Sequence, residues 1–170
     1  MTITTNHDEN SWAGTVFERY GEGHQAFATF IFTAYGFPMI YSGQEVGLDK
    51  RLLFFEKDTI QWDDPNKLTP FYKELVQMKK DNEALWNGGY GGTPKRINND
   101  EWIYAFSRKK GGNQVIGLIN MSDAEQTFNL TDASVAGTYT DRFSQASFTL
   151  AADQPIVMKP WQYLIFENNN

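Results

Sequence analysis

One segment, residues 22–35, restricts the possible folds more than any other part of the sequence. Positions 26–28, 30–32 and 34 are apolar, so a helix here would be hydrophobic on almost every face and would need cover on several sides. Apolar or β-branched runs lie on either side, at residues 3–5 and 37–41, and Gly36 and Pro38 prevent the helix from continuing. The order strand, helix, strand predicts a βα unit of a parallel sheet.

Polar side chains follow the first of these runs. Asn6, His7 and Asp8 bring an amide, an imidazole and a carboxylate within one turn of chain, enough to hold several hydroxyl groups of one ligand. An isolated triplet of this kind is also typical of a solvated turn or a helix cap. The interpretation therefore depends on the second run, which continues into Ser42-Gly43-Gln44-Glu45.

The two runs together resemble the seventh and eighth barrel strands of the α-amylase family of glycoside hydrolases. In that family the seventh strand closes with Asn-His-Asp, and the eighth is similar to residues 36–45, GFPMIYSGQE. The resemblance covers most of this chain but only the last part of such an enzyme. It implies that residues 1–92 are the C-terminal end of a (β/α)8 catalytic barrel, incomplete here because a whole barrel takes about 250 residues.

Between the second motif and the glycine-rich run at 88–92, the sequence predicts a loop and a helix. Residues 47–66 show no periodicity and indicate a long loop, a kind of segment that often carries binding groups. Thr69-Pro70 is typical of a helix start, and the apolar stripe that follows ends near Trp86.

Beyond the glycine-rich run, the sequence indicates short strands separated by turns. Residues 102–108 and 115–120 predict a hairpin, and further strands are expected near 126–130, 137–141, 147–150, 156–158 and 163–167. The resemblance implies that residues 93–170 form the antiparallel β-sandwich that follows the barrel. The expected fold class is therefore α/β plus all-β, a partial (β/α)8 barrel of the last two βα units followed by an antiparallel β-sandwich.

Composition narrows the function classes. With 15 basic and 21 acidic residues the net charge is −6, which disfavours a nucleic-acid partner. The absence of cysteine excludes disulfides and thiolate metal sites, and no apolar run approaches membrane-spanning length. No cofactor or metal is expected from the spacing of the remaining ligand-type residues. We expect any signal peptide to lie upstream of Met1, so a secreted, periplasmic or cytoplasmic location in a bacterial-like protein stays open.

The resemblance implies roles for four residues. Asp8 would stabilise the transition state by accepting hydrogen bonds from the 2- and 3-hydroxyls of the glucose at the cleavage point. His7 would donate to the same sugar, Asn6 would brace the strand end and Trp12 would stack on a glucose ring. The family's nucleophile and general acid come from its fourth and fifth strands, which have no counterpart here, so the chain alone is expected to be inactive. The sequence departs from the family after Asp8, where it lacks an arginine that many members carry.

The expected function is the C-terminal portion of a retaining enzyme that acts on α-1,4-glucans such as starch, glycogen and maltodextrins. The alternatives are a non-catalytic carbohydrate-binding or scaffolding module, or a partner subunit that completes a barrel. Because open strand edges and a bare apolar helix recruit other chains, self-association through residues 1–45 is also expected.

Overall fold

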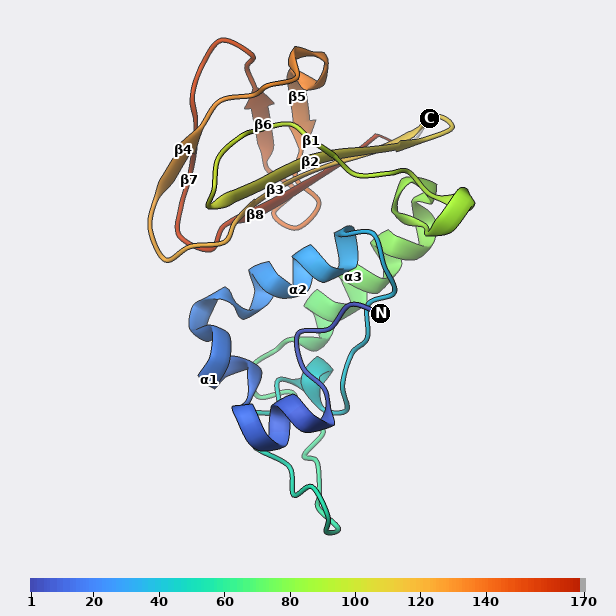
Figure 1. Ribbon diagram of the computed structural model, residues 1–170, viewed down its shortest axis with the longest axis vertical. Helices are drawn as coiled ribbons and strands as arrows, with labels where there is room; N and C mark the ends of the chain where they lie inside the picture. The colour runs from blue at the N-terminus through green and yellow to red at the C-terminus, as the bar shows by residue number, and fades with distance from the viewer. Residues whose placement is uncertain (169–170) are drawn as a thin grey trace.

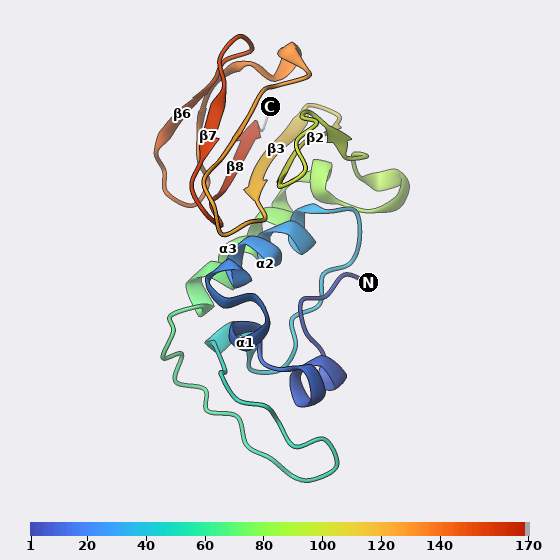
Figure 2. The same ribbon diagram turned by 60° about the vertical axis from the view of Figure 1, so that its left-hand side comes forward.

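The computed structural model describes residues 1–168, in which a β-sandwich stacks on a helical part (Figure 1). The helices are α1 (Val16–Tyr20), α2 (His24–Thr33) and α3 (Thr69–Asp81). The strands are β1 (Lys95–Arg96), β2 (Ile103–Lys110), β3 (Asn113–Asn120), β4 (Gln126–Phe128), β5 (Gly137–Thr140), β6 (Ser147–Leu150), β7 (Ile156–Met158) and β8 (Tyr163–Asn168). A long irregular segment before α3 extends away from both parts (Figure 2).

The sandwich contains one larger sheet and two strand pairs. The larger sheet has the order β1-β2-β3-β8, and β4 pairs with β7 and β5 with β6, all antiparallel. The β2–β3 hairpin pairs from Ile103↔Asn120 to Lys110↔Asn113, and its turn places Gly111 at a φ of +55°, where glycine is favoured. The predicted hairpin and the later strands are therefore confirmed, whereas β1 was not predicted from the sequence.

The larger sheet is buried on both faces. Along β3, Val115 and Ile119 belong to a core shared with the helices, while Ile116 and Leu118 belong to the core inside the sandwich. This alternation is the period-two geometry of a strand. A Cβ on Gly117 would lie 2.2 Å from the Phe106 ring, so only glycine lets that ring pack against the sheet. The sandwich is thus joined to the helices by a continuous core rather than by a linker.

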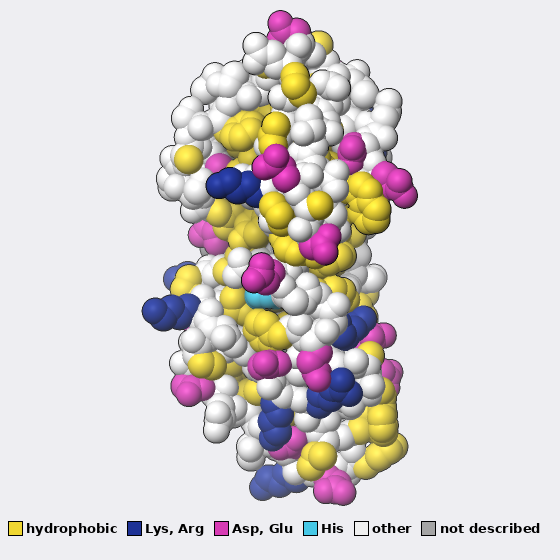
Figure 3. Space-filling model, turned by 90° about the vertical axis from the view of Figure 1, so that its left-hand side faces the viewer, with side chains coloured by type: hydrophobic (Ala, Val, Ile, Leu, Met, Phe, Trp, Pro, Cys, Tyr) yellow, Lys and Arg dark blue, Asp and Glu magenta, His cyan; other side chains and the backbone are white. Residues whose placement is uncertain are grey.

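Helix α2 is covered by the sandwich and by α3. Ile31 and Phe32 are buried against Leu75 and Met78 of α3, and hydrophobic side chains gather in the belt where the two parts meet (Figure 3). The expectation that this helix would leave its large apolar side chains bare is therefore wrong. Segment 93–168 and α3 together supply the cover that this helix needs.

Two cations lie at this junction and bind backbone carbonyl groups. Arg108 of β2 is 0% exposed, and its guanidinium donates to the carbonyl oxygens of Thr33 and Ala34 at the end of α2, and of Trp86 and Gly92 in the connection to the sandwich. Lys79 of α3 donates to two further carbonyl groups, those of Phe32 and Leu85. Positive charge at the C-terminal end of a helix is favourable, which accounts for the position of both cations.

The start of α3 differs from the prediction. Thr69 is the first helical residue rather than the cap, and the orphan N–H groups of Leu68 and Thr69 donate to the Asp64 carboxylate at 2.7 and 3.1 Å. The carboxylate comes from the preceding loop, where Asp64 adopts a φ of +46°. The helix also ends earlier, at Asp81, and a 3-10 turn at Glu83–Leu85 completes the predicted segment.

The two expected barrel strands do not form as strands. Residues 3–5 and 37–41 are reduced to a single parallel bridge between Thr2 and Pro38, in which the N–H groups of Thr2 and Met39 donate to Phe37 and Thr2 carbonyls at 2.8 and 3.0 Å. A strand interior to a barrel needs a hydrogen-bonded neighbour on each side, and within residues 1–168 each segment has only the other. The partial-barrel part of the expected fold class is accordingly reduced here to a mixed helical and irregular part.

Candidate functional site

The motif residues His7 and Asp8 lie on the surface at the end of the molecule opposite the sandwich. Their side chains are 63% and 59% exposed, and His7 Nε2 lies 3.5 Å from Asp8 Oδ2. His7 and Asp8 directly precede a π-helical turn, Glu9–Ala13. Asn6 caps the start of this helical segment, since its side chain accepts a hydrogen bond from the Glu9 N–H at 2.8 Å. Asn6 therefore positions the turn, while His7 and Asp8 remain available to a ligand.

An aromatic cluster adjoins this pair. Trp12 is 62% exposed, and its ring centroid lies 5.3 Å from that of Phe54 and 6.4 Å from that of Phe55. Phe54 also lies 5.5 Å from the His7 ring. The structure thus links the His7–Asp8 pair to Trp12 through the Phe54 ring, and Phe54 and Phe55 come from the long loop. Two consecutive phenylalanines in a loop without periodicity are the sequence feature from which this contribution could have been predicted.

Side chains that follow the motif anchor this loop. Asn10 is buried, donates to the Lys50 carbonyl at 3.1 Å and accepts from the Leu52 N–H at 2.8 Å, so its amide is matched to the loop backbone. Ser11 donates to the Leu52 carbonyl at 2.7 Å. These contacts hold the aromatic loop residues against the motif.

The first turn of α1 adds a second attachment. Thr15 and Glu18 form a reciprocal capping box, and the Thr15 hydroxyl also donates to Asp49 at 2.7 Å. Glu18 in addition accepts two hydrogen bonds from Arg51, which lowers the pKa of its carboxyl group. These roles of Asn10, Thr15 and Glu18 were missed from the sequence, because each partner lies more than thirty positions away.

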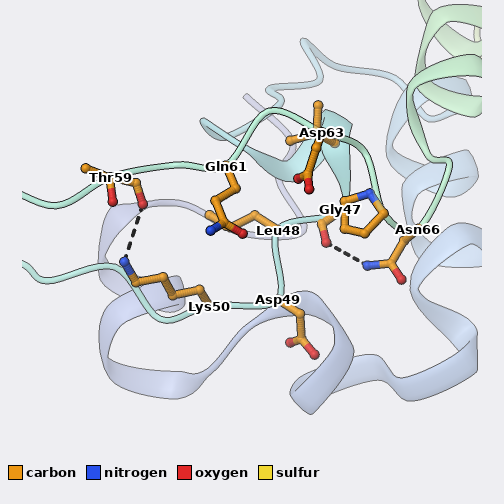
Figure 4. Close-up of a pocket in the computed structure, with 10 residues that line it drawn as sticks. Gly47, Leu48, Asp49, Lys50, Thr59, Gln61, Asp63 and Asn66 are labelled. Carbon is orange, nitrogen blue, oxygen red and sulfur yellow. Dashed lines mark hydrogen bonds between the residues drawn. The ribbon is translucent and has the colours of Figure 1, made fainter.

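The same loop borders a cleft of about 300 Å³ (Figure 4). The Lys50 ammonium group donates to the Thr59 backbone carbonyl across the loop at 3.3 Å, and the Asn66 side-chain amide donates to the Gly47 carbonyl at 2.8 Å. Asp58, which pairs with Lys50 and accepts from the Leu53 and Thr59 N–H groups, has its pKa lowered to about 2. The carboxylate is thus fixed as an anion that closes the loop on itself.

The second motif braces the site rather than lining it. Gln44 is buried, donates to the Thr4 and Tyr72 hydroxyls at 2.7 Å each and accepts from the Tyr41 N–H at 3.1 Å. Burial raises the pKa of the Tyr72 hydroxyl, so it stays protonated. The Thr69 hydroxyl donates to the backbone carbonyl of Glu45 at 3.2 Å.

Within residues 1–168, no three His, Asp or Glu side chains are close enough to share a metal ion. None of the helices in this described part has the length and apolar character needed to cross a membrane.

Comparison with curated proteins gives a consistent set of relatives. The chain is 30% identical to α-amylase 2 of Dictyoglomus thermophilum over 161 residues, which cover 88% of this chain and 26% of that protein. It is 32% identical to the cyclomaltodextrin glucanotransferase of Bacillus licheniformis, with 98% of this chain and 24% of that protein covered. The chain thus spans about a quarter of the length of these relatives. No protein-family model matches it.

Solved structures share the fold. A maltogenic α-amylase from Thermotoga neapolitana superimposes with a TM-score of 0.77 at 19% identity, over 98% of this chain and 40% of that one. A γ-cyclomaltodextrin glucanotransferase from alkalophilic Bacillus clarkii gives 0.74 at 16% identity, over 99% and 26%. At these identities the likeness concerns the arrangement of the chain alone.

Proposed function

This chain belongs to the α-amylase family of glycoside hydrolases, and from that premise we propose that it is the C-terminal portion of a retaining enzyme that acts on α-1,4-glucans. The substrates would be starch, glycogen or maltodextrins. The observation that carries this proposal is the exposed His7–Asp8 pair, held next to Trp12 and Phe54 by a capped turn. Because the relatives are enzymes, they favour this function over a non-catalytic binding or scaffolding module.

We assign residues 1–92 to the end of a catalytic barrel and residues 93–170 to its C-terminal sandwich. The Thr2–Pro38 bridge supports this assignment, since it is parallel and α2 lies between its two segments, as in a βα unit. The six missing βα units would pair with these segments on both sides and convert them into strands. They would also supply the nucleophile and the general acid, which this chain lacks.

Within such a barrel, Asp8 would accept hydrogen bonds from two adjacent sugar hydroxyls. A carboxylate accepts from both at once, and these bonds strengthen as the ring gains oxocarbenium character, so they lower the barrier rather than only tighten binding. His7 would donate to the same ring, and Trp12 would present its indole face to a neighbouring glucose. Asn6 would fix the turn that carries them.

A chimeric enzyme tests this proposal. Here the chain replaces the matching quarter of the Dictyoglomus α-amylase, and hydrolysis of maltoheptaose is measured. We expect an active chimera in which Asp8→Asn lowers kcat by about 10²–10³-fold with little change in stability. Asp123→Asn, at an exposed sandwich position, is the matched control and should leave kcat unchanged. A folded chimera that keeps its full activity after Asp8→Asn would exclude the role of Asp8.

For the separate chain we propose self-association through residues 1–45. The outer edges of the two segments joined by the Thr2–Pro38 bridge and the 68% exposed Phe37 support an isologous dimer, because unpaired edges recruit strands. Light scattering should give twice the monomer mass. Replacement of the exposed Phe37 by aspartate, which places a charge beside this edge, should shift the equilibrium toward the monomer, and a monomeric wild type would exclude this proposal.

A further inference from the structure

A second cleft, of about 500 Å³, lies where α3 meets the sandwich, away from the motif residues. We call it the junction cleft. The turn between β5 and β6 forms one side of it and extends from the sheet toward the helices (Figure 1). Its volume falls in the range of about 300–1,000 Å³ that is typical of ligand sites. The residues that matter for its chemistry are Gln25, Phe71, Glu74, Arg142, Phe143 and Tyr163.

Three aromatic rings form the floor of the junction cleft. Phe143 lies 5.1 Å from Tyr163 and 5.8 Å from Phe71, and Phe71 lies 5.9 Å from Tyr163, measured between ring centroids. All three side chains are partly exposed. They come from α3, the β5–β6 turn and β8, so the platform exists only when both parts of the molecule are packed together. Aromatic faces of this kind suit a ligand with an apolar face and polar edges.

The rim of the junction cleft is polar, and its arginine is paired. The Arg142 guanidinium donates to Glu74 on one side and to Glu167 on the other. The Tyr163 hydroxyl donates to Gln25 Oε1 at 2.9 Å, and Gln145 donates to the Arg142 carbonyl at 2.7 Å. Carboxylates, a guanidinium and amides therefore surround the rings, with both donors and acceptors. The two carboxylates are balanced by the guanidinium and by the exposed Lys67 ammonium group, so the rim has no net charge and does not favour an anion.

We propose that the junction cleft is a second, non-catalytic binding site for glucosyl units of an α-glucan. The C–H face of a glucose ring packs on Phe143 and Tyr163, and its hydroxyls exchange hydrogen bonds with Glu74, Arg142 and the Gln25 amide. The identity of the sugar rests on the proposed function, whereas the neutral, polyhydroxylated character of the ligand follows from the cleft.

Titration of the isotope-labelled chain with maltoheptaose, followed by NMR, tests this proposal. We expect shifts of the ring resonances of Phe71, Phe143 and Tyr163 and of the Gln25 side-chain amide at millimolar sugar. Phe143→Ala should weaken the Kd about tenfold, the loss of one ring contact. Gln25→Ala, which removes no ring, should also weaken it and serves if the first variant does not fold. Tyr90→Ala, at an exposed position outside the cleft, is the matched control.

The outcomes separate this site from the proposed active site. Shifts confined to His7, Asp8 and Trp12, no shifts at all, or equal shifts with a cello-oligosaccharide would overturn the second α-glucan site. Shifts in the cleft that persist in the Asp8→Asn chain support it, even if the chimera described above proves inactive. An inactive chimera with an empty cleft would count against both proposals, each by its own measurement.

Discussion

Arg108 provides the sharpest test of how the two parts of the molecule are held together. Replacement by methionine keeps much of the side-chain volume and removes all four hydrogen bonds to carbonyl oxygens, which lie 2.7–3.1 Å from the guanidinium nitrogens. Among the described residues no carboxylate pairs with this guanidinium. The cost of burying its charge is therefore offset by the carbonyl groups and by the Tyr35 ring, whose centroid lies 5.5 Å from Arg108 Cζ. We therefore expect a large destabilisation.

The magnitude follows from two opposing terms. Four hydrogen bonds from a charged donor, at about 1.5–3 kcal/mol each, sum to roughly 6–12 kcal/mol. Against this, the wild type loses several kcal/mol when it takes the guanidinium out of water, a cost that methionine avoids. The net loss in the free energy of unfolding for Arg108→Met should be about 3–5 kcal/mol. Arg108→Lys keeps the charge but not the planar fork, and should lose roughly half as much.

Urea unfolding at pH 7, followed by circular dichroism and by tryptophan fluorescence, measures these changes. Arg96→Met is the matched control, since Arg96 is exposed and donates only to Asn98, Asp100 and Ile103 within the sandwich itself, so it should cost about 1 kcal/mol or less. If Arg108→Met lowered the free energy of unfolding no more than Arg96→Met does, the four hydrogen bonds from Arg108 to carbonyl groups would not stabilise the junction. Our account of how the two parts are held together would then be refuted.

Three further expectations follow from the same contacts. Gln44→Leu should lower the free energy of unfolding by about 2–3 kcal/mol, because it leaves two buried hydroxyls and one N–H without their partner; a loss below 1 kcal/mol would contradict this. Burial lowers the pKa of Lys79 to about 8, below its usual 10.5, so stability should rise with pH between these values, and Lys79→Met should flatten that rise. Trypsin should cut first in segment 50–67 and spare the β2–β3 hairpin, whereas early cleavage in the hairpin would argue against a protected sheet.

Local sequence signals sufficed for the sandwich. The β2–β3 hairpin could be predicted because Gly111 and Gly112 separate two apolar runs, and the turn requires a positive φ at the first of them. The sequence VIGLI of β3 reads as a strand with both faces buried, and both faces are in fact covered. These signals lie within about ten residues of each other, where turn chemistry and periodicity decide the structure.

The features that failed depend on distant partners. Segments 3–5 and 37–41 carry strand sequences, but pairing is decided by neighbours that no local pattern encodes. Arg108 follows a serine and precedes two lysines, and such a run reads as the end of an exposed strand, yet its side chain is wholly buried. At the site, the motif itself was found from the sequence, while Phe54 was not, because it reaches His7 from a loop without periodicity.

The sandwich is connected to the motif by a short series of contacts rather than by touching it. The Trp161 ring lies 6.1 Å from Phe27 of α2, Phe27 lies 4.7 Å from Tyr20 at the end of α1, and the Tyr20 hydroxyl donates to the Thr4 carbonyl at 3.0 Å, two residues before Asn6. The fit is close at its first step, because a Cβ on Gly23 would lie 2.7 Å from the indole ring. A sandwich that only added stability could have packed anywhere on the helices. Here it packs on α2, the helix that contacts Tyr20, and Tyr20 in turn binds the backbone just before the motif. The position of His7 and Asp8 therefore depends on a core to which both parts of the chain contribute.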